Sequence, residues 1–170
     1  MVTIRPAVAD DVPAITDLSN ALLTSTSYEW TETPHTIDER GAWLTSQQAG
    51  GWPVLVAVDD RTVVGWAGYG EFRDTTKWPG YRFCVEHTIH VAESHWSAGV
   101  GRQLMEALIR TAGEAGLWAM VGGIDGTNVR SIRFHERLGF REVARLPGIG
   151  EKAGKRLDLV LVQLDLVPPG

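Results

Sequence analysis

The sequence has few of the residues and patterns that mark several large classes of protein. Its single cysteine, Cys84, excludes an internal disulfide framework and suits a reducing compartment. Its net charge of −5 argues against nucleic-acid binding, and no apolar run is long enough to span a membrane. The five histidines show no metal-ligand spacing with the cysteine. We therefore expect a cytoplasmic protein with no metal and with neither nucleic acid nor membrane as a partner.

The composition is otherwise that of an ordinary globular protein. Of the 170 residues, 44% are hydrophobic and 22% are charged. This length suits one domain with a sizeable core. Because no internal repeat, low-complexity segment or long linker divides it, we expect residues 1–170 to form a single domain.

Hydrophobic spacing predicts strands and helices in a mixed order. Strands are expected at residues 2–6, 52–58, 62–69, 81–91, 117–124, 140–146 and 156–166. Helices are expected from residue 10 through Leu22, and at 36–48, 99–115 and 128–138, whereas 25–34 and 70–80 are connections and 167–170 is a tail. This order favours an α/β sheet with helices on both faces.

The most informative segment is a strand that leads through a glycine-rich turn into a helix. Residues 86–91 alternate as a strand, and Gly99 and Gly101 lie in the turn before a helical repeat of apolar residues. A helix N-terminus presents unpaired N–H groups and a partial positive charge. The segment therefore predicts a cradle for phosphate groups.

Two common phosphate-binding motifs do not fit this turn. The dinucleotide fingerprint requires a third glycine where this chain has Leu104. A Walker A loop requires Gly-Lys-Ser/Thr, but Arg102 and Gln103 follow Gly101. The remaining pattern is a Gly-x-Gly turn followed by a basic residue.

The chain resembles the GNAT superfamily of acyl-CoA-dependent N-acetyltransferases at two places. Residues 96–101 are similar to the family's Arg/Gln-x-x-Gly-x-Gly/Ala turn, with Trp96 in place of the leading Arg or Gln. Asn128, Ser131 and the helix ending at 139–140 are similar to a second family signature, in the expected order. The resemblance covers almost the whole chain. It implies the GNAT fold, a mixed central β-sheet flanked by helices on both faces, with splayed central strands.

A narrower resemblance points to the phosphinothricin and methionine sulfoximine N-acetyltransferases. It rests on residues 27–30, 80–82, 85–91, 134–136 and the spacing of Lys152, Gly154 and Asp158. It implies a homodimer that transfers acetyl from acetyl-CoA to the α-amino group of a small amino acid or analogue, by direct attack of the amine on the thioester. Glu151 and Arg156 depart from the subfamily pattern, which leaves the natural substrate open.

The family resemblance also implies which residues bind acetyl-CoA. The backbone of residues 89–91 would pair with pantetheine, and residues 97–102 would hold the diphosphate. Asn128 would contact the coenzyme near its pantetheine arm, with Ser131 assisting. The full set is Ile89, His90, Val91, Ser97, Ala98, Gly99, Val100, Gly101, Arg102, Asn128 and Ser131. Asn128 is equally suited to cap its helix.

The same resemblance makes Glu86 the candidate general base, with His135 as a cooperating group. Burial would raise the pKa of a carboxyl and make it a better proton acceptor, and a neutral imidazole can accept or relay a proton near neutral pH. Structural interpretations stay open: a solvated strand carboxylate for Glu86 and a buried, hydrogen-bonded histidine for His135.

The amine substrate is expected to lie near Glu86. Arg73 and Arg82 are candidates for its carboxylate or phosphinate, because a planar guanidinium binds two oxygens at once. The candidate substrate-binding residues are Tyr28, Trp30, Arg73, Arg82, Glu86, His87 and Thr88, with Glu29 beside Tyr28. Surface arginines and a packed loop are the alternatives.

Two other functions stay open at this point. A peptide or protein N-terminal acetyltransferase would have an open groove and little use for Arg73 together with Arg82. A non-catalytic acyl-CoA-binding regulatory module is favoured by Trp96 and by Phe134, which has no proton to give a leaving thiolate. The presence of Glu86 argues against that module.

Overall fold

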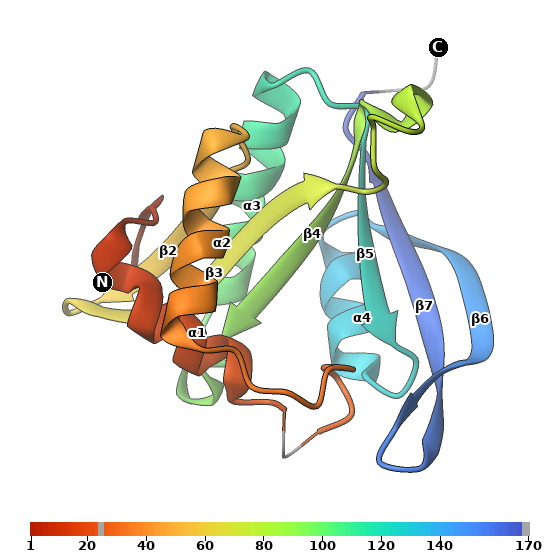
Figure 1. Ribbon diagram of the computed structural model, residues 1–170, viewed down its shortest axis with the longest axis horizontal. Helices are drawn as coiled ribbons and strands as arrows, with labels where there is room; N and C mark the ends of the chain where they lie inside the picture. Colours follow the sequence, from red (N-terminus) through yellow and green to blue (C-terminus); the bar gives the residue numbers. More distant parts are fainter. Residues whose placement is uncertain (24–25, 168–170) are drawn as a thin grey trace.

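The computed structural model describes residues 1–23 and 26–167 and contains one seven-stranded mixed sheet (Figure 1). The sheet order is β1-β2-β3-β4-β5-β7-β6. The strands are β1 (Thr3–Pro6), β2 (Val54–Asp59), β3 (Thr62–Glu71), β4 (Cys84–Val91), β5 (Ala119–Asp125), β6 (Arg141–Lys152) and β7 (Lys155–Asp165). β4 and β5 pair in parallel, and the other neighbouring strands pair antiparallel.

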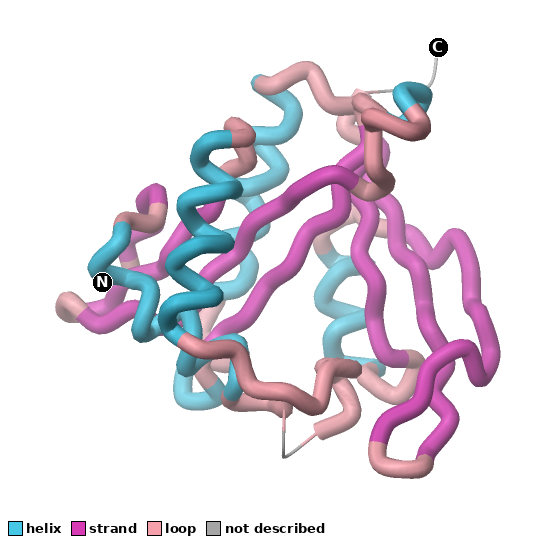
Figure 2. Tube along the Cα trace, in the orientation of Figure 1, coloured by secondary structure: helices cyan, strands magenta, loops and turns pink. Residues whose placement is uncertain are grey.

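Helices lie on both faces of the sheet, as expected for this fold class. They are α1 (Val12–Asn20), α2 (Ile37–Ala49), α3 (Val100–Glu114) and α4 (Val129–Arg137). α1 and α2 cover one face, and α3 and α4 cover the other (Figures 1 and 2). Within the described ranges, no helix is long and apolar enough to cross a membrane.

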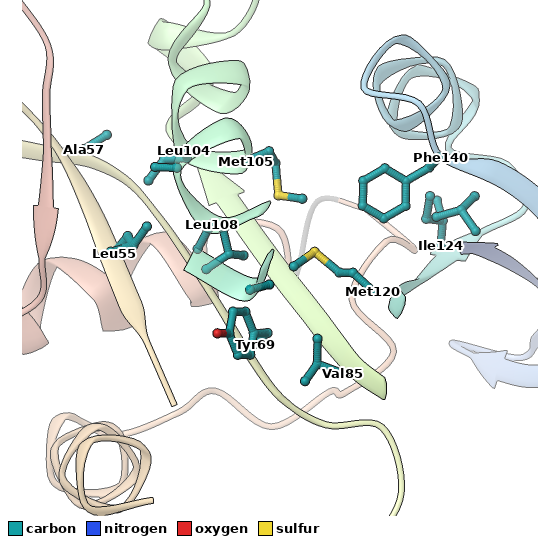
Figure 3. Close-up of a cluster of buried hydrophobic side chains, with 14 of the residues drawn as sticks. Leu55, Ala57, Tyr69, Val85, Leu104, Met105, Leu108, Met120, Ile124 and Phe140 are labelled. Atoms are coloured by element: carbon teal, nitrogen blue, oxygen red, sulfur yellow. The ribbon is translucent and has the colours of Figure 1, made fainter. Parts of the chain in front are cut away.

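A hydrophobic core fills each side of the sheet. On one side, α3 buries Leu104, Met105 and Leu108 against the strands (Figure 3). On the other, Ile15 of α1 and Trp66 of β3 belong to a smaller cluster. Burial of one large aliphatic side chain contributes about 1.5–3 kcal/mol, so the α3 core holds β4 firmly on that face.

Two element boundaries near prolines differ from the sequence prediction. The strand expected from residue 81 starts at Cys84, because Pro79–Tyr81 forms a 3₁₀ turn. The strand expected to end at 146 continues through Pro147 to Lys152, with irregular pairing between Leu146 and Gly150. β6 is an edge strand, where proline is tolerated because one side needs no N–H donor.

The prediction for the first helix also differs from the structure. A 3₁₀ turn, Ala9–Asp11, precedes α1, and α1 ends at Asn20, so Leu22 lies beyond the helix. The predicted connection 25–34 and tail 167–170 fall partly on residues 25 and 168–170, which lie outside the described residues.

The central strands separate after a short parallel contact. β4 and β5 pair only at Cys84↔Ala119, Val85↔Met120 and Glu86↔Val121, and then diverge (Figure 1). This confirms the predicted splay. We call the resulting opening, between residues 87–91 of β4 and 122–125 of β5, the fork. Residues 26–36 cross its open end (Figure 1).

Candidate active site

A cleft of about 420 Å³ lies at the open end of the fork. It is lined by the end of β4, the turn into α3 and the exposed side of α4, together with Tyr28 from the α1–α2 connection. His90 stacks on Trp66 on one face of the sheet and Phe134 packs with the α3 core on the other, so the cleft reaches both faces beside the end of β4. All the residues predicted to bind the coenzyme line it except Ala98 and Val100. Val100 is buried in the α3 core.

The turn before α3 has a left-handed backbone at two alternate residues. Ser97 has φ +62°, and Gly99 has φ +84°. Such turns direct successive N–H groups toward one point and commonly bind anions. At Gly101, an added Cβ would lie 3.4 Å from the ring of Phe134, so glycine allows α3 to approach α4 closely. The predicted phosphate cradle therefore has suitable geometry, with a strained serine that the sequence did not reveal.

Asn128 is the N-cap of α4, which is the structural role expected for it as an alternative to coenzyme binding. Its Oδ1 accepts a hydrogen bond from the backbone N–H of Ser131 at 3.0 Å. Both residues line the cleft, so the cap brings the N-terminus of α4 to the same space as the N-terminus of α3. Two helix N-termini therefore meet in one cleft, which favours an anionic ligand.

Trp96 and Arg130 form a pair that sequence reasoning did not find. The Trp96 indole Nε1–H donates to the Val91 carbonyl oxygen at 2.8 Å. The Arg130 guanidinium carbon lies 3.9 Å from the centre of the Trp96 ring, and both residues line the cleft. Only the fold brings Arg130, on α4, to the loop that holds Trp96.

Glu86 lies where β4 and β5 begin to separate. A Cβ added at Gly123 of β5 would lie 3.5 Å from Glu86 Oε1, so the carboxylate leans over the fork. Loss of solvent raises the pKa of Glu86, and the positive charge of Arg73 lowers it in part. A raised pKa makes the carboxylate a better proton acceptor. This environment suits the predicted general base.

The structure does not bring His135 together with Glu86. Neighbouring strand residues point to opposite faces, so Glu86 and His87 diverge, and His135 stacks on His87 with ring centres 5.0 Å apart. His135 Nδ1–H donates to the Ser131 carbonyl at 2.7 Å, and its Nε2 is buried with no partner among the described residues. No contact supports the predicted cooperation.

His87 is buried among rings and glycine backbone. A Cβ added at Gly122 would lie 2.7 Å from its Nε2, and burial lowers the pKa of His87 to about 3. Its side chain is therefore neutral and closed off from a substrate, in contrast to the prediction. Thr88 lies exposed on the same strand face as Glu86 and keeps its candidate role.

The two candidate arginines have different surroundings. Arg73 is near enough to Glu86 to lower its pKa, with its guanidinium carbon 5.3 Å from the Phe72 ring centre. Arg82 lies over the Phe83 ring at 4.6 Å and donates to the Pro79 carbonyl at 3.0 Å. Arg73 is therefore placed to contact a substrate bound at Glu86, whereas Arg82 is engaged with its own loop.

The loop of residues 26–30 is attached to the tip of the β6–β7 hairpin by a buried ammonium. Lys152, only 8% exposed, donates from Nζ to the carbonyls of Leu23, Thr26 and Glu29 at 2.7, 3.0 and 2.5 Å. A lysine ammonium has three donors, so all of them are used. The sequence singled out Lys152 only as part of a motif, and the structure gives it this role.

Trp30 strengthens the same attachment. Its Nε1–H donates to Asp125 Oδ2, at the end of β5, at 3.3 Å. Its ring packs so closely on Gly150 of β6 that a Cβ there would overlap it. Trp30 thus acts as a wall of the fork through packing, whereas Tyr28 is exposed and lines the cleft.

Glu29 contacts β4 on the Glu86 face. Its Oε1 lies 3.4 Å from His90 Nε2, and the His90 ring stacks on Trp66 at 5.1 Å. Burial lowers the pKa of His90 to about 4 and raises the pKa of Glu29. His90 is therefore neutral near pH 7, and the contact is a polar one rather than an ion pair.

No group of three or more His, Cys, Asp or Glu able to hold a metal ion occurs among the residues that the structure describes. Backbone N–H donors and the side chains of Arg102, Arg130 and Arg137 line the cleft, and the carboxylate acceptors Glu29 and Glu86 lie on the other face of β4. This arrangement fits an anionic ligand in the cleft and an amine beside Glu86.

Comparisons with known proteins agree with this geometry. Residues 15–140 match the acetyltransferase (GNAT) family. An L-methionine sulfoximine/L-methionine sulfone acetyltransferase from Salmonella typhimurium is 39% identical over 164 residues, covering 96% of this chain and 94% of the relative.

Two solved structures have the same fold. A phosphinothricin acetyltransferase from Sinorhizobium meliloti in complex with acetyl-CoA gives a TM-score of 0.90 at 30% identity, covering 96% of this chain and 88% of the other. A ribosomal-protein-alanine N-acetyltransferase from Brucella melitensis gives a TM-score of 0.92 at 36% identity, covering 96% of this chain and 99% of the other.

Proposed function

The chain belongs to the acetyltransferase (GNAT) family, and we propose that it acetylates the α-amino group of a small amino acid or analogue. Methionine sulfoximine and phosphinothricin are the model substrates, because the relatives' names specify them. The observation that best supports this proposal is the position of Glu86, which lies at the fork on the opposite side of β4 from the α4 helix and is influenced by the charge of Arg73. An amine and an acyl donor would therefore meet in the fork.

The groups that line the cleft are of the kinds that bind the diphosphate and the pantetheine amides of acetyl-CoA. The left-handed turn at Ser97 and Gly99, with the α3 N-terminus, offers N–H groups to the diphosphate. The separated edge of β4 offers backbone donors and acceptors to the amides of pantetheine. The coenzyme would supply the acetyl group as a thioester.

The chain's own residues would then perform three tasks. Arg73 binds the substrate carboxylate or phosphinate and orients the amine toward the fork. Glu86 accepts the proton that the ammonium must lose before its nitrogen attacks, directly or through one water. Backbone N–H groups of residues 89–91 stabilise the negative charge that develops on the carbonyl oxygen.

We also propose that residues 1–170 act as one domain, in the cytoplasm, as a homodimer. A free cysteine supports a reducing compartment. Val143, Leu146 and Ile149 are exposed along β6, an edge strand of the sheet, which supports an interface between copies. Light scattering at micromolar concentration tests the dimer, and a monomer mass would overturn it.

The test of the proposed reaction is thiol release from acetyl-CoA with a panel of amines. The panel contains methionine sulfoximine, methionine sulfone, phosphinothricin, the common amino acids and short peptides. We expect turnover with the first three and none with peptides. Coenzyme binding without turnover on any amine would instead support a regulatory module.

A second candidate function is N-terminal acetylation of a protein. The likeness to a ribosomal-protein-alanine N-acetyltransferase favours it. Peptides that begin with alanine discriminate the two, since a free α-carboxylate beside Arg73 is available only in an amino acid. Higher kcat/KM for such peptides than for free amino acids would select this second function.

A further inference from the structure

The Trp96–Arg130 pair places a cation at the cleft, beside the first residue of the glycine turn. The family turn commonly begins with Arg or Gln, and this chain has Trp96 at that position. Trp96 cannot carry a charge, but the Arg130 guanidinium lies 3.9 Å from its ring centre. The cation at this position of the cleft therefore comes from α4 rather than from the turn itself.

Among the described residues, Arg130 and Arg137 line the cleft without an ion-pair partner, and Arg130 is the one held against an aromatic ring. Arg102, in the turn, is bound by Glu106 with Nε to Oε1 at 2.6 Å. No carboxylate lies within 4.0 Å of Arg130 among the described residues. An exposed guanidinium with free N–H donors, held against an aromatic face, is suited to a phosphate oxygen pair.

Trp96 also fixes where that cation lies. Its indole N–H donates to the Val91 carbonyl at 2.8 Å, which ties the ring to the last residue of β4. A ring held in this way limits the rotamers of Arg130, so less side-chain freedom is lost when a ligand binds. The guanidinium is thereby preorganised at the cleft, in the first turn of α4 and against the Trp96 ring.

We propose that Arg130, held on the indole of Trp96, is a phosphate-binding residue for the coenzyme, supplying the unpaired cation that the turn lacks because its Arg102 is bound by Glu106. The inference rests on the proposed use of acetyl-CoA. It assigns Arg130 to recognition of a phosphate group and Trp96 to positioning of that arginine.

The first experiment compares acetyl-CoA affinity by calorimetry in two arginine variants. Arg130→Met should raise the dissociation constant about 10-fold or more, because a hydrogen-bonded charge pair is lost. Arg133→Met, an exposed arginine on the same helix that does not line the cleft, is the matched control and should bind as the parent does. Equal affinity of Arg130→Met and the parent would overturn the proposal.

The second experiment separates phosphate recognition from helix or cleft damage. The two variants are titrated with acetyl-CoA, with its 3′-dephospho form and with S-acetylpantetheine, which has no phosphate. If Arg130→Met loses affinity for both acetyl-CoA and its 3′-dephospho form, Arg130 contacts the diphosphate. If it loses affinity for acetyl-CoA alone, Arg130 contacts the 3′-phosphate. An equal loss with S-acetylpantetheine would refute a phosphate contact.

The third experiment tests the positioning role of Trp96. Trp96→Phe keeps a ring under Arg130 but removes the N–H that donates to Val91, and should weaken acetyl-CoA binding by a few fold without changing S-acetylpantetheine binding. Trp96→Arg in the Arg130→Met background should restore affinity, because it returns a cation to the turn. If the folded double variant does not regain affinity for acetyl-CoA, Arg130 does not supply the cation for this turn.

The outcomes distinguish this inference from the proposed function. A parent protein that binds and uses acetyl-CoA, with an unaffected Arg130→Met variant, overturns the inference alone. A parent protein that does not bind acetyl-CoA overturns both.

Discussion

The coenzyme side and the amine side of the fork are built by different means. Apart from Leu22 and Tyr28, the coenzyme side uses two continuous stretches, residues 89–102 and 128–138, and its key donors are backbone N–H groups at two helix N-termini. The amine side gathers Glu86, Arg73, the loop 26–30 and the β6–β7 tip, which are distant in sequence. A site made of backbone follows from local conformation, whereas a site made of side chains depends on the ties between segments.

The two sides also differ in charge. Arg102, Arg130 and Arg137 line the coenzyme cleft. On the other side, the carboxylates of Glu29 and Glu86 have raised pKa values because they lose solvent. The cations of the cleft suit an anionic coenzyme, and Glu86 with Arg73 suits an amino acid that has both an amine and a carboxylate, so each variant below should affect one side more than the other.

The largest expected effect is on the amine side, from Glu86→Gln. The amide keeps the shape of the carboxylate but cannot accept the ammonium proton, so kcat should fall by roughly 100-fold to 1,000-fold. The dissociation constant of acetyl-CoA should stay unchanged, because Glu86 does not line the coenzyme cleft. Steady-state rates and calorimetry check both values, and kcat within a few fold of the parent would remove Glu86 as the base.

Next is Lys152→Met, which cuts the tie between the loop 26–30 and the hairpin tip. Three carbonyls lose a charged donor, so the free energy of unfolding should fall by about 3 kcal/mol, and KM for the amine should rise by roughly tenfold as the wall loosens. Lys155→Met, an exposed lysine on the same hairpin, is the control. If the lost stability comes with an unchanged KM for the amine, Lys152 holds the fold but not the site.

Gly101→Val tests the coenzyme side. An added Cβ would touch the Phe134 ring, and the branched methyl groups would crowd the cleft, so acetyl-CoA affinity should fall by roughly fivefold to tenfold. Gly113→Val on the same helix is the matched control, because a Cβ there meets nothing within 4 Å. Should both variants lose affinity equally, the cause is the helix and not the cleft.

The smallest expected effect is a pH shift from Arg73→Gln. Because a protonated Glu86 cannot accept a proton, kcat/KM should decline as the pH falls through the pKa of Glu86, which burial holds above its ordinary value. Arg73 lowers that pKa, so its removal should raise the pKa and move the acid limb to higher pH. Arg82→Gln is the control and should leave the acid limb of the pH profile unchanged. If the acid limb of Arg73→Gln does not move either, Arg73 does not influence the ionisation of Glu86.

The same contrast explains what the sequence could predict. The strand, glycine turn and helix over residues 86–115 follow local rules of spacing and backbone freedom, and the resemblance added the splay. Asn128 could be placed as a helix cap for the same local reason. The predicted coenzyme residues line the cleft apart from two, because that side is local in sequence.

The amine side was harder to predict because its contacts join distant segments. No local signal places Lys152 under the carbonyls of Leu23, Thr26 and Glu29, or Trp30 on Gly150. The pairing of His135 with Glu86 could have been doubted, since strand alternation already sends Glu86 and His87 to opposite faces. Arg130 was missed because aromatic stacking on Trp96 leaves no trace in spacing.

The short parallel contact between β4 and β5 has a consequence for hydrogen exchange. Beyond Glu86, alternate amides of β4 point into the fork, where β5 provides no partner. These amides exchange with water unless another group accepts from them. They lie in the middle of the sheet, beside the paired amides of β3 and β4, so slowed exchange along residues 87–91 would record occupancy of the fork without any label on the ligand.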